Sequence, residues 1–237
     1  MRMKFKPWAR EELETSPFYI DNPCDYKEKW KTAFERQAPI YVELGCGKGN
    51  FIAQLSKKNQ GINYIAVDLV DAMLGMAKRK VEATYGIRNS TVAEEVEDEI
   101  EKQKVVKNLK LIRYDISRIS DIFDKQDSIS RIYINFCNPW PRGKHHKKRL
   151  THERQLEQYA KFLNGEIFFK TDDDGLFEDS IKYFERSGYL IEKITRDLAS
   201  ELDFWNGESN IITEHERMFM NDGIKIKALI AKNIIDN

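Results

Sequence analysis

Short apolar segments alternate with longer amphipathic segments along most of this chain, and this alternation constrains the fold more than any other feature of the sequence. Five apolar segments have the β-branched and aromatic bias of buried strands: residues 39–45, 62–68, 109–115, 130–136 and 165–172. Helical spacing predicts helices over residues 51–58, 72–85, 93–107, 152–162 and 176–187. Strands that alternate with helices form a parallel, doubly wound sheet, so we predict an α/β fold.

Two further apolar segments follow Gly188: YLIEKITRDL (189–198) and GIKIKALIAK (223–232). They are joined by a segment that contains a predicted helix over residues 214–220. We therefore predict a hairpin-like addition, which gives a mostly parallel seven-stranded sheet with a C-terminal antiparallel strand and helices on both faces.

The length and charge of the chain limit the classes of protein to which it can belong. Its 237 residues, 41% of them hydrophobic, predict one domain over 1–237, with 1–38 an N-terminal arm and helix before the core. Lys plus Arg and Asp plus Glu balance at 39 each, so any signal of nucleic-acid binding must be local. Three cysteines without a CxxC pair, and no apolar run long enough to cross a bilayer, predict a cytoplasmic protein without disulfides.

A glycine-rich turn, Glu43-Leu-Gly45-Cys-Gly47-Lys-Gly49-Asn50, lies where the first strand should lead into the first helix. Glycines there let the backbone approach a ligand and leave the N–H groups of the helix N-terminus free to bind its polar parts. Asn50 stands at the third glycine position of a dinucleotide fingerprint, and Lys48 is not followed by Ser or Thr, so neither a dehydrogenase nor a Walker site is favoured.

Two acidic residues follow the next two predicted strands. Asp68 stands about 20 residues after the glycine turn and is placed to accept hydrogen bonds from a ribose diol. Asp115 is placed to meet an adenine amino group. Either acid alone is equally well explained as a solvated residue at a strand end. Their joint occurrence after a glycine turn favours a nucleoside-containing cofactor.

The fourth strand ends at a proline-fixed corner, Asn138-Pro139-Trp140-Pro141, followed by a basic segment. Ligands of open α/β sheets bind beyond the carboxyl ends of the strands, so this corner is predicted to lie beside the cofactor. Its prolines restrict the turn and suit a side chain held against a reacting atom. The basic segment carries four candidate contacts to an RNA backbone: Lys144, Lys147, Lys148 and Arg149. A solvated basic turn is the simpler alternative.

The N-terminal stretch MRMKFKPWAR mixes cations with Phe5 and Trp8, which is a reasonable composition for an arm that orders on RNA, although a disordered start explains it nearly as well. His145 and His146 are adjacent and lack the spacing of metal ligands, so we predict no metal site. The sequence leaves a monomer and a homodimer open.

Several segments in order resemble the bacterial tRNA (guanine-N7)-methyltransferase family: RMKFKPWA, NPCDYKEKW, VELGCGKGNFI, NPWPRGKHHKKRLT, FFKTDDDGLFEDS and TEHERMF. The resemblance spans nearly the whole chain and implies the Rossmann-like class I methyltransferase fold. It also implies transfer of a methyl group from S-adenosyl-L-methionine to N7 of a guanosine in the variable loop of tRNA.

The resemblance also implies residue roles. The cofactor-binding positions are Glu43, Gly45, Gly47, Gly49, Asp68, Asp115 and Asn138, the last also at the catalytic position, and the substrate-binding positions are Arg142, Asp172, Thr213 and Glu216. Two positions depart from the family pattern: Asn138 replaces the usual Asp, and Arg142 replaces the usual Lys. The stretch over residues 88–106 is longer than the family's usual linker.

Guanine N7 has a lone pair and no proton, so its methylation requires placement and charge stabilisation instead of a general base. Glu216 is the first candidate and Asp172 the second for accepting the guanine N1–H and 2-amino groups, although Thr213-Glu214-His215-Glu216 equally fits a helix capping box. Two alternatives stay open: methylation of an exocyclic amine of the adenine N6 type, since Asn-Pro precedes an aromatic residue, and a tRNA-binding protein with impaired catalysis.

Overall fold

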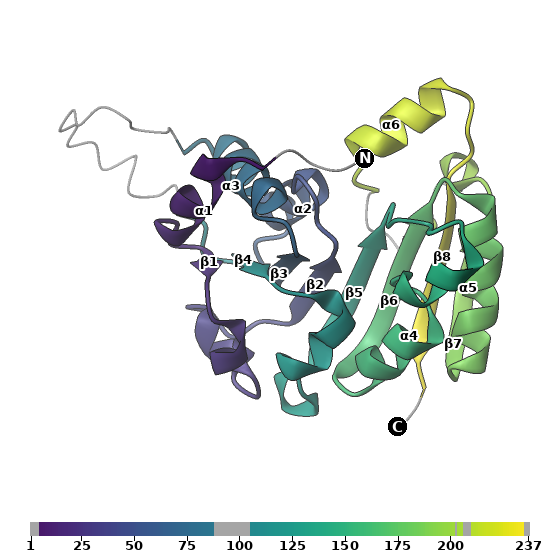
Figure 1. Cartoon of the computed structure of the whole chain (residues 1–237), viewed down its shortest axis with the longest axis horizontal. Helices are drawn as coiled ribbons and strands as arrows, with labels where there is room; N and C mark the ends of the chain where they lie inside the picture. The colour runs from purple at the N-terminus through teal and green to yellow at the C-terminus, as the bar shows by residue number, and fades with distance from the viewer. Residues whose placement is uncertain (1–4, 88–104, 202, 206–209, 235–237) are drawn as a thin grey trace.

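The computed structural model describes residues 5–87, 105–201, 203–205 and 210–234. Within these residues one mixed sheet runs through the molecule in the order β1-β4-β3-β2-β5-β6-β8-β7 (Figure 1). Its strands are β1 (Tyr19–Ile20), β2 (Ile40–Leu44), β3 (Asn63–Asp68), β4 (Leu109–Arg113), β5 (Ile129–Asn135), β6 (Leu163–Thr171), β7 (Tyr189–Thr195) and β8 (Lys227–Asn233).

The strand directions match the predicted layout. Strands β1 to β6 pair in parallel, whereas β8 is antiparallel to both β6 and β7. The seven predicted strands are all present, and the α/β class I architecture is confirmed. An eighth strand, β1, adds two residues at the edge beside β4. A two-residue strand has no measurable alternation, so sequence periodicity could not reveal it.

The described residues also form six α-helices: α1 (Pro7–Glu14), α2 (Asn50–Lys58), α3 (Asp71–Tyr85), α4 (Glu153–Ala160), α5 (Asp174–Arg186) and α6 (Glu214–Asn221). The predicted helices agree with α2 to α6 to within two residues at each end. Residues 88–104 lie outside the described residues, so the helix predicted over 93–107 is untested except at 105–107, which are not helical. The basic stretch expected as an arm is helical from Pro7 onward.

Successive residues of the central strands enter two separate cores. Val42, Ile132 and Ile167 belong to the cluster that also contains Leu156 of α4 and Phe177 of α5. The alternate residues, among them Tyr64, Tyr133 and Phe168, pack against side chains of α2 and α3. Helices therefore cover both faces of the sheet (Figure 1).

Strand β2 lies between β3 and β5, which is where the strand order reverses direction. In open α/β sheets the crevice at this point, beyond the carboxyl ends of the strands, holds the ligand. The glycine turn, Asp68 and the Asn138 corner follow β2, β3 and β5, so all three lie at this edge of the sheet.

Candidate active site

The glycine turn bends at three residues with left-handed backbone, Gly45, Gly47 and Gly49, whose φ angles are 77°, 53° and 73°. Gly49 is the N-cap of α2 and provides no side chain to cap it. A Cβ atom at Gly49 would lie 2.6 Å from Cβ of Ala77, so only glycine lets the start of α2 pack this closely on α3. Gly49 offers no side-chain cap to the first turn of α2, whose N–H groups are suited to an anionic group of a ligand.

Asp68 joins the glycine turn to the corner at the end of β3. Its Oδ2 accepts a hydrogen bond from the Gly47 N–H group at 3.0 Å, and its Oδ1 accepts one from Val70 N–H at 2.9 Å. Burial raises the pKa of Asp68, while these two backbone donors oppose the rise. Its carboxylate is thus held rigidly at the place predicted for a ribose ligand.

Asp115 lies beyond the end of β4 and is exposed. It caps the 3₁₀ helix Ile116–Asp121, since its Oδ1 accepts a hydrogen bond from Ser117 N–H at 2.9 Å. Asp68 ends β3 and Asp115 follows the adjacent parallel strand β4, so both lie at the carboxyl edge of the sheet.

A group of polar side chains extends from β2 toward α6, in which Glu43, Lys170 and Glu216 are buried and Asn135 and Asn210 are half-buried. Glu43 Oε1 accepts a hydrogen bond from Asn135 Nδ2 at 3.0 Å across the β2–β5 pair. Asn135 is in register with Lys170 of β6, and Lys170 Nζ forms an ion pair with Glu216 Oε2 at 2.6 Å. Asn210 donates to the other Glu216 oxygen at 2.5 Å. This polar group therefore extends from β2 through β5 and β6 to α6.

Burial shifts the pKa values of Glu43 and Lys170 in opposite directions. Burial is the largest influence on Glu43 and raises its pKa to about 8, against the lowering effects of Asn135 and Lys170. Burial also lowers the pKa of Lys170, while Glu216 and Glu43 raise it. Because Lys170 contacts Glu216 directly, we assign the charged pair to Lys170 and Glu216 and the proton to Glu43 at neutral pH.

The corner after β5 contains two non-glycine residues with left-handed backbone, Phe136 with φ 50° and Trp140 with φ 44°. Between them, Asn138 is exposed, and its Oδ1 accepts a hydrogen bond from Trp140 N–H at 2.9 Å. Local strain of this kind is maintained only where the surroundings fix the backbone. The Asn138 side chain is consequently presented at a defined place on the carboxyl edge of the sheet.

Arg149 fixes this corner from the inside. It is 3% exposed, and its Nε donates to the Pro139 carbonyl at 2.7 Å while Nη1 pairs with Asp179 of α5 at 2.7 Å. The prediction that Arg149 contacts an RNA backbone is therefore wrong for this conformation, because internal acceptors engage its guanidinium. The other basic residues of the segment, Arg142, Lys144, Lys147 and Lys148, are exposed.

The remaining predicted substrate residues divide into buried and accessible ones. Thr213 and Glu216 are 6% and 2% exposed and form the capping box of α6: Thr213 Oγ1 accepts from Glu216 N–H, and Glu216 accepts from Thr213 N–H. Asp172 follows β6 directly and is partly exposed. Of Glu216 and Asp172, the two carboxylates predicted to bind the guanine base, Asp172 is the accessible one.

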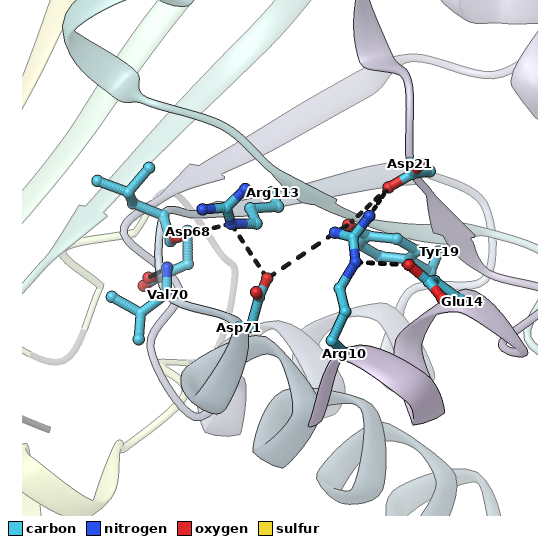
Figure 2. A network of polar contacts seen from close by, with 9 residues as sticks. Arg10, Glu14, Tyr19, Asp21, Asp68, Val70, Asp71 and Arg113 are labelled. Carbon is cyan, nitrogen blue, oxygen red and sulfur yellow. Dashed lines mark hydrogen bonds and ion pairs between the residues drawn. The ribbon is translucent and has the colours of Figure 1, made fainter. Parts of the chain in front are cut away.

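Sequence reasoning missed Asn135, Lys170, Arg113 and Asp71. Lys170 and Asn135 lie in an apolar context that resembles ordinary strand, and their pairing across β5 and β6 depends on register. Arg113 Nε lies 3.1 Å from Asp71 Oδ1 at the corner that carries Asp68 (Figure 2). Lys170 could have been singled out from the sequence, because a Lys within an apolar predicted strand would be buried, and buried Lys side chains are rare.

A small, partly open pocket lies beside this polar group, lined by Phe51, Leu55, Tyr133, Asn135, Phe168, Lys170, Trp205, Asn210 and Ile211. Among the described residues no group of three or more His, Cys, Asp or Glu side chains is arranged to hold a metal ion. No helix within these residues is long and apolar enough to span a membrane.

Comparison with known proteins places this geometry in a family. Residues 37–229 match a family described as putative methyltransferase. A tRNA (guanine-N(7)-)-methyltransferase of Clostridium botulinum (strain Alaska E43 / Type E3) is 52% identical, with 98% of each chain covered. The protein with this name from Clostridium perfringens (strain 13 / Type A) is 49% identical, over 99% of this chain and all of its own. The chain belongs to the tRNA (guanine-N(7)-)-methyltransferase family.

Solved structures support the fold of this tRNA (guanine-N(7)-)-methyltransferase family member. An antibiotic-related methyltransferase superimposes with a TM-score of 0.53 at 13% identity, over 86% of this chain and 92% of its own. The aminoglycoside resistance methyltransferase NpmB1 gives 0.52 at 15% identity, with the same coverage. At such identities the similarity establishes the methyltransferase fold alone.

Proposed function

We propose that this protein transfers a methyl group from S-adenosyl-L-methionine to N7 of a guanosine in the variable loop of tRNA. The observation that carries the proposal is the identity of 46–53% to relatives named tRNA (guanine-N(7)-)-methyltransferase over at least 98% of this chain. A tRNA substrate would place the reaction in the cytoplasm.

The residues at the carboxyl edge fit the proposed cofactor. The uncapped N-terminus of α2 suits the amino-acid carboxylate, and Asp68 suits the ribose diol. Asp115, exposed on the adjacent strand end, suits the adenine amino group. Glu43 underlies the glycine turn from a buried position. When bound, S-adenosyl-L-methionine supplies an electrophilic methyl group on its sulfonium.

The chain's own contribution to the reaction is placement. Guanine N7 attacks with its in-plane lone pair; the N–C bond forms as the C–S bond breaks, and sulfur keeps the electron pair. No proton moves, so no general base is required. In-line placement of two reactants supplies up to about 7–11 kcal/mol of the barrier. The corner, which the hydrogen bond from Trp140 N–H to Asn138 Oδ1 fixes, would supply this placement, and the partial negative charge of the amide oxygen would stabilise the positive charge that develops on the purine.

Asp172 is the side chain that we propose accepts hydrogen bonds from the guanine N1–H and 2-amino groups. Glu216 preceded it on sequence grounds, but its carboxylate is occupied by Lys170, Asn210 and the helix cap. Asp172→Asn is expected to raise KM for tRNA about tenfold, since one charge-assisted acceptor is lost. Glu216→Gln is expected to lower the unfolding midpoint instead, because it leaves the Lys170 ammonium buried without its counter-charge.

The exposed basic residues Arg142, Lys144, Lys147 and Lys148 suit the phosphates of the RNA backbone. They follow the Asn138 corner directly, so backbone binding and presentation of the base take place on one connection of the fold.

The decisive experiment incubates the purified protein with S-adenosyl-L-methionine and unmodified tRNA, followed by mass analysis of nucleosides and mapping of the modified position. We expect 7-methylguanosine in the variable loop. N6-methyladenosine would instead favour the exocyclic-amine alternative, motivated by Asn138-Pro139 before an aromatic residue. Binding of both cofactor and tRNA without product would indicate impaired catalysis.

A further inference from the structure

A line of polar contacts runs from Asp68 at the end of β3 to Arg10 of the N-terminal helix (Figure 2). Asp68 accepts hydrogen bonds from the N–H groups of Gly47 and Val70. The Leu69 carbonyl accepts a hydrogen bond from Arg113 Nε at 3.1 Å. Arg113 is the last residue of β4, so a second strand holds the corner that follows β3.

The peptide unit between Leu69 and Val70 connects Arg113 to Asp68. It is trans, so its carbonyl and its N–H group point in opposite directions. Arg113 holds the carbonyl, and Asp68 Oδ1 accepts from the N–H group. Fixing one end of the peptide unit therefore fixes the donor that orients the Asp68 carboxylate.

Arg113 is itself held from α3 and α1. Its Nε lies 3.1 Å from Oδ1 of Asp71, the first residue of α3, and Arg10 Nη1 lies 4.0 Å from the same oxygen. Arg10 is anchored in turn by Glu14 at 2.7 Å, by the Tyr19 hydroxyl at 2.9 Å and by Asp21. Helix α1 and strand β1 thus converge on the corner, as Figure 2 shows.

We propose that Arg113 is a positioning residue for the ribose-binding carboxylate of Asp68, and that Asp71 and Arg10 hold Arg113 in place. The proposal rests on the proposed function, since Asp68 meets a ribose only if the cofactor is a nucleoside. The same contacts fix Leu69 and Val70, which are 50% and 41% exposed and form an apolar edge beside Asp68. Arg10 of α1 and Tyr19 of β1 thereby connect the N-terminal segment to the proposed cofactor site.

The test is calorimetric titration of the full-length protein with S-adenosyl-L-homocysteine, the stable product of methyl transfer. Arg113→Met is expected to weaken binding about threefold to tenfold, which corresponds to the loss of one hydrogen bond. Arg113→Lys is expected to recover part of the loss, because an ammonium can still donate to the Leu69 carbonyl. Thermal unfolding verifies that each variant is folded. Equal affinity of Arg113→Met and the wild type would overturn the proposal.

A ligand without the diol separates positioning of Asp68 from a general structural role. The 2′,3′-dideoxy analogue of S-adenosyl-L-homocysteine cannot use the Asp68 carboxylate. Wild type and Arg113→Met are expected to bind this analogue with equal affinity. A loss of the same size for both ligands would overturn the proposal, because it would show that Arg113 acts on the site as a whole.

The Glu12–Arg79 ion pair provides a matched control. It also joins α1 to α3, with Arg79 Nε 2.9 Å from Glu12 Oε2, but it does not contact the corner. Glu12→Gln is expected to leave the affinity for S-adenosyl-L-homocysteine unchanged, whereas Asp71→Asn is expected to weaken it. Equal losses in both variants would overturn the proposal, since attachment of α1 alone would then explain the effect.

Failure of the proposed function is distinguishable from failure of this inference. If the wild type binds no S-adenosyl-L-homocysteine, the cofactor assignment is wrong and both fall. If the wild type binds it and Arg113→Met binds equally well, only the positioning role is overturned.

Discussion

Glu43 and Lys170 are buried ionisable residues on neighbouring regions of the same sheet face, yet they carry different charges. Lys170 lies 2.6 Å from the Glu216 carboxylate, and this ion pair compensates its burial. Within the described residues, the side-chain donor that contacts Glu43 is the Asn135 amide. An amide dipole compensates a buried charge less well than an ammonium, so Glu43 retains its proton.

This proton predicts a pH-dependent stability. The pKa of Glu43 in the folded protein is about 8, whereas an exposed glutamate has a pKa of about 4.3. Between these values the folded state binds a proton that the unfolded state releases, so the free energy of unfolding falls as pH rises from about 5 to about 8. The difference in free energy of unfolding between the wild type and Glu43→Gln is expected to decrease by at most about 1.4 kcal/mol per pH unit, as measured by urea denaturation. Parallel pH profiles would show that Glu43 is ionised in the folded protein.

The corner at Asn138 is expected to tolerate replacement of the amide by a carboxylate. Its Oδ1 accepts from Trp140 N–H, and a carboxylate would accept the same hydrogen bond, so Asn138→Asp preserves the corner. A negative charge stabilises the positive charge that develops on guanine better than an amide does. We expect kcat for methyl transfer to be retained or to rise by up to about tenfold. A fall in kcat at unchanged tRNA affinity would show that the amide N–H group is required.

At the scale of elements, the junction between β2 and α2 depends on close packing against α3. Gly49→Ala places a Cβ atom 2.6 Å from Ala77 Cβ and 2.9 Å from its Cα, at a φ of 73°. We expect this variant to lose about 2–4 kcal/mol of unfolding free energy, from backbone strain and overpacking together.

Gly47→Ala is the matched control, because its φ is also positive but nothing lies within 4 Å of the added Cβ. It is expected to lose only about 1–2 kcal/mol from backbone strain. Urea denaturation without cofactor measures both variants. Equal losses would show that helix packing contributes nothing at Gly49.

The elements themselves follow from local sequence, whereas several contacts of the site do not. The alternating strands and helices were predictable because each segment carries its own periodicity, and the glycine turn and Asp68 were found because their spacing is local. Arg113 of β4 and Asp71 of α3 are far apart in the sequence and meet only in the folded chain, so no short sequence pattern predicts their contact. Arg149 was misplaced because composition marks a cation but does not reveal whether internal acceptors surround it.

At the scale of the whole molecule, balanced charge conceals a local asymmetry. Lys144, Lys147 and Lys148 are exposed on the 3₁₀ helix Gly143–Lys148, beyond the carboxyl end of β5. Lys29, Lys31 and Lys125 are also exposed, but they lie on segments that lead into β2 and β5 and hence at the opposite edge of the sheet. If tRNA binds at the carboxyl edge, only the first set neutralises phosphates.

Two triple Lys→Gln variants with the same change in net charge test this arrangement. Each phosphate contact contributes about 0.7–0.9 to the slope of log affinity against log salt concentration. Neutralising Lys144, Lys147 and Lys148 is expected to weaken tRNA binding and to reduce the magnitude of that slope by about 2–3. Neutralising Lys29, Lys31 and Lys125 is expected to leave the slope close to that of the wild type, because a charge farther away than about 8–10 Å is screened at physiological salt. Filter binding of tRNA across a salt series measures both slopes. Equal changes in the two variants would mean that net charge alone, and not the carboxyl edge of the sheet, attracts the RNA.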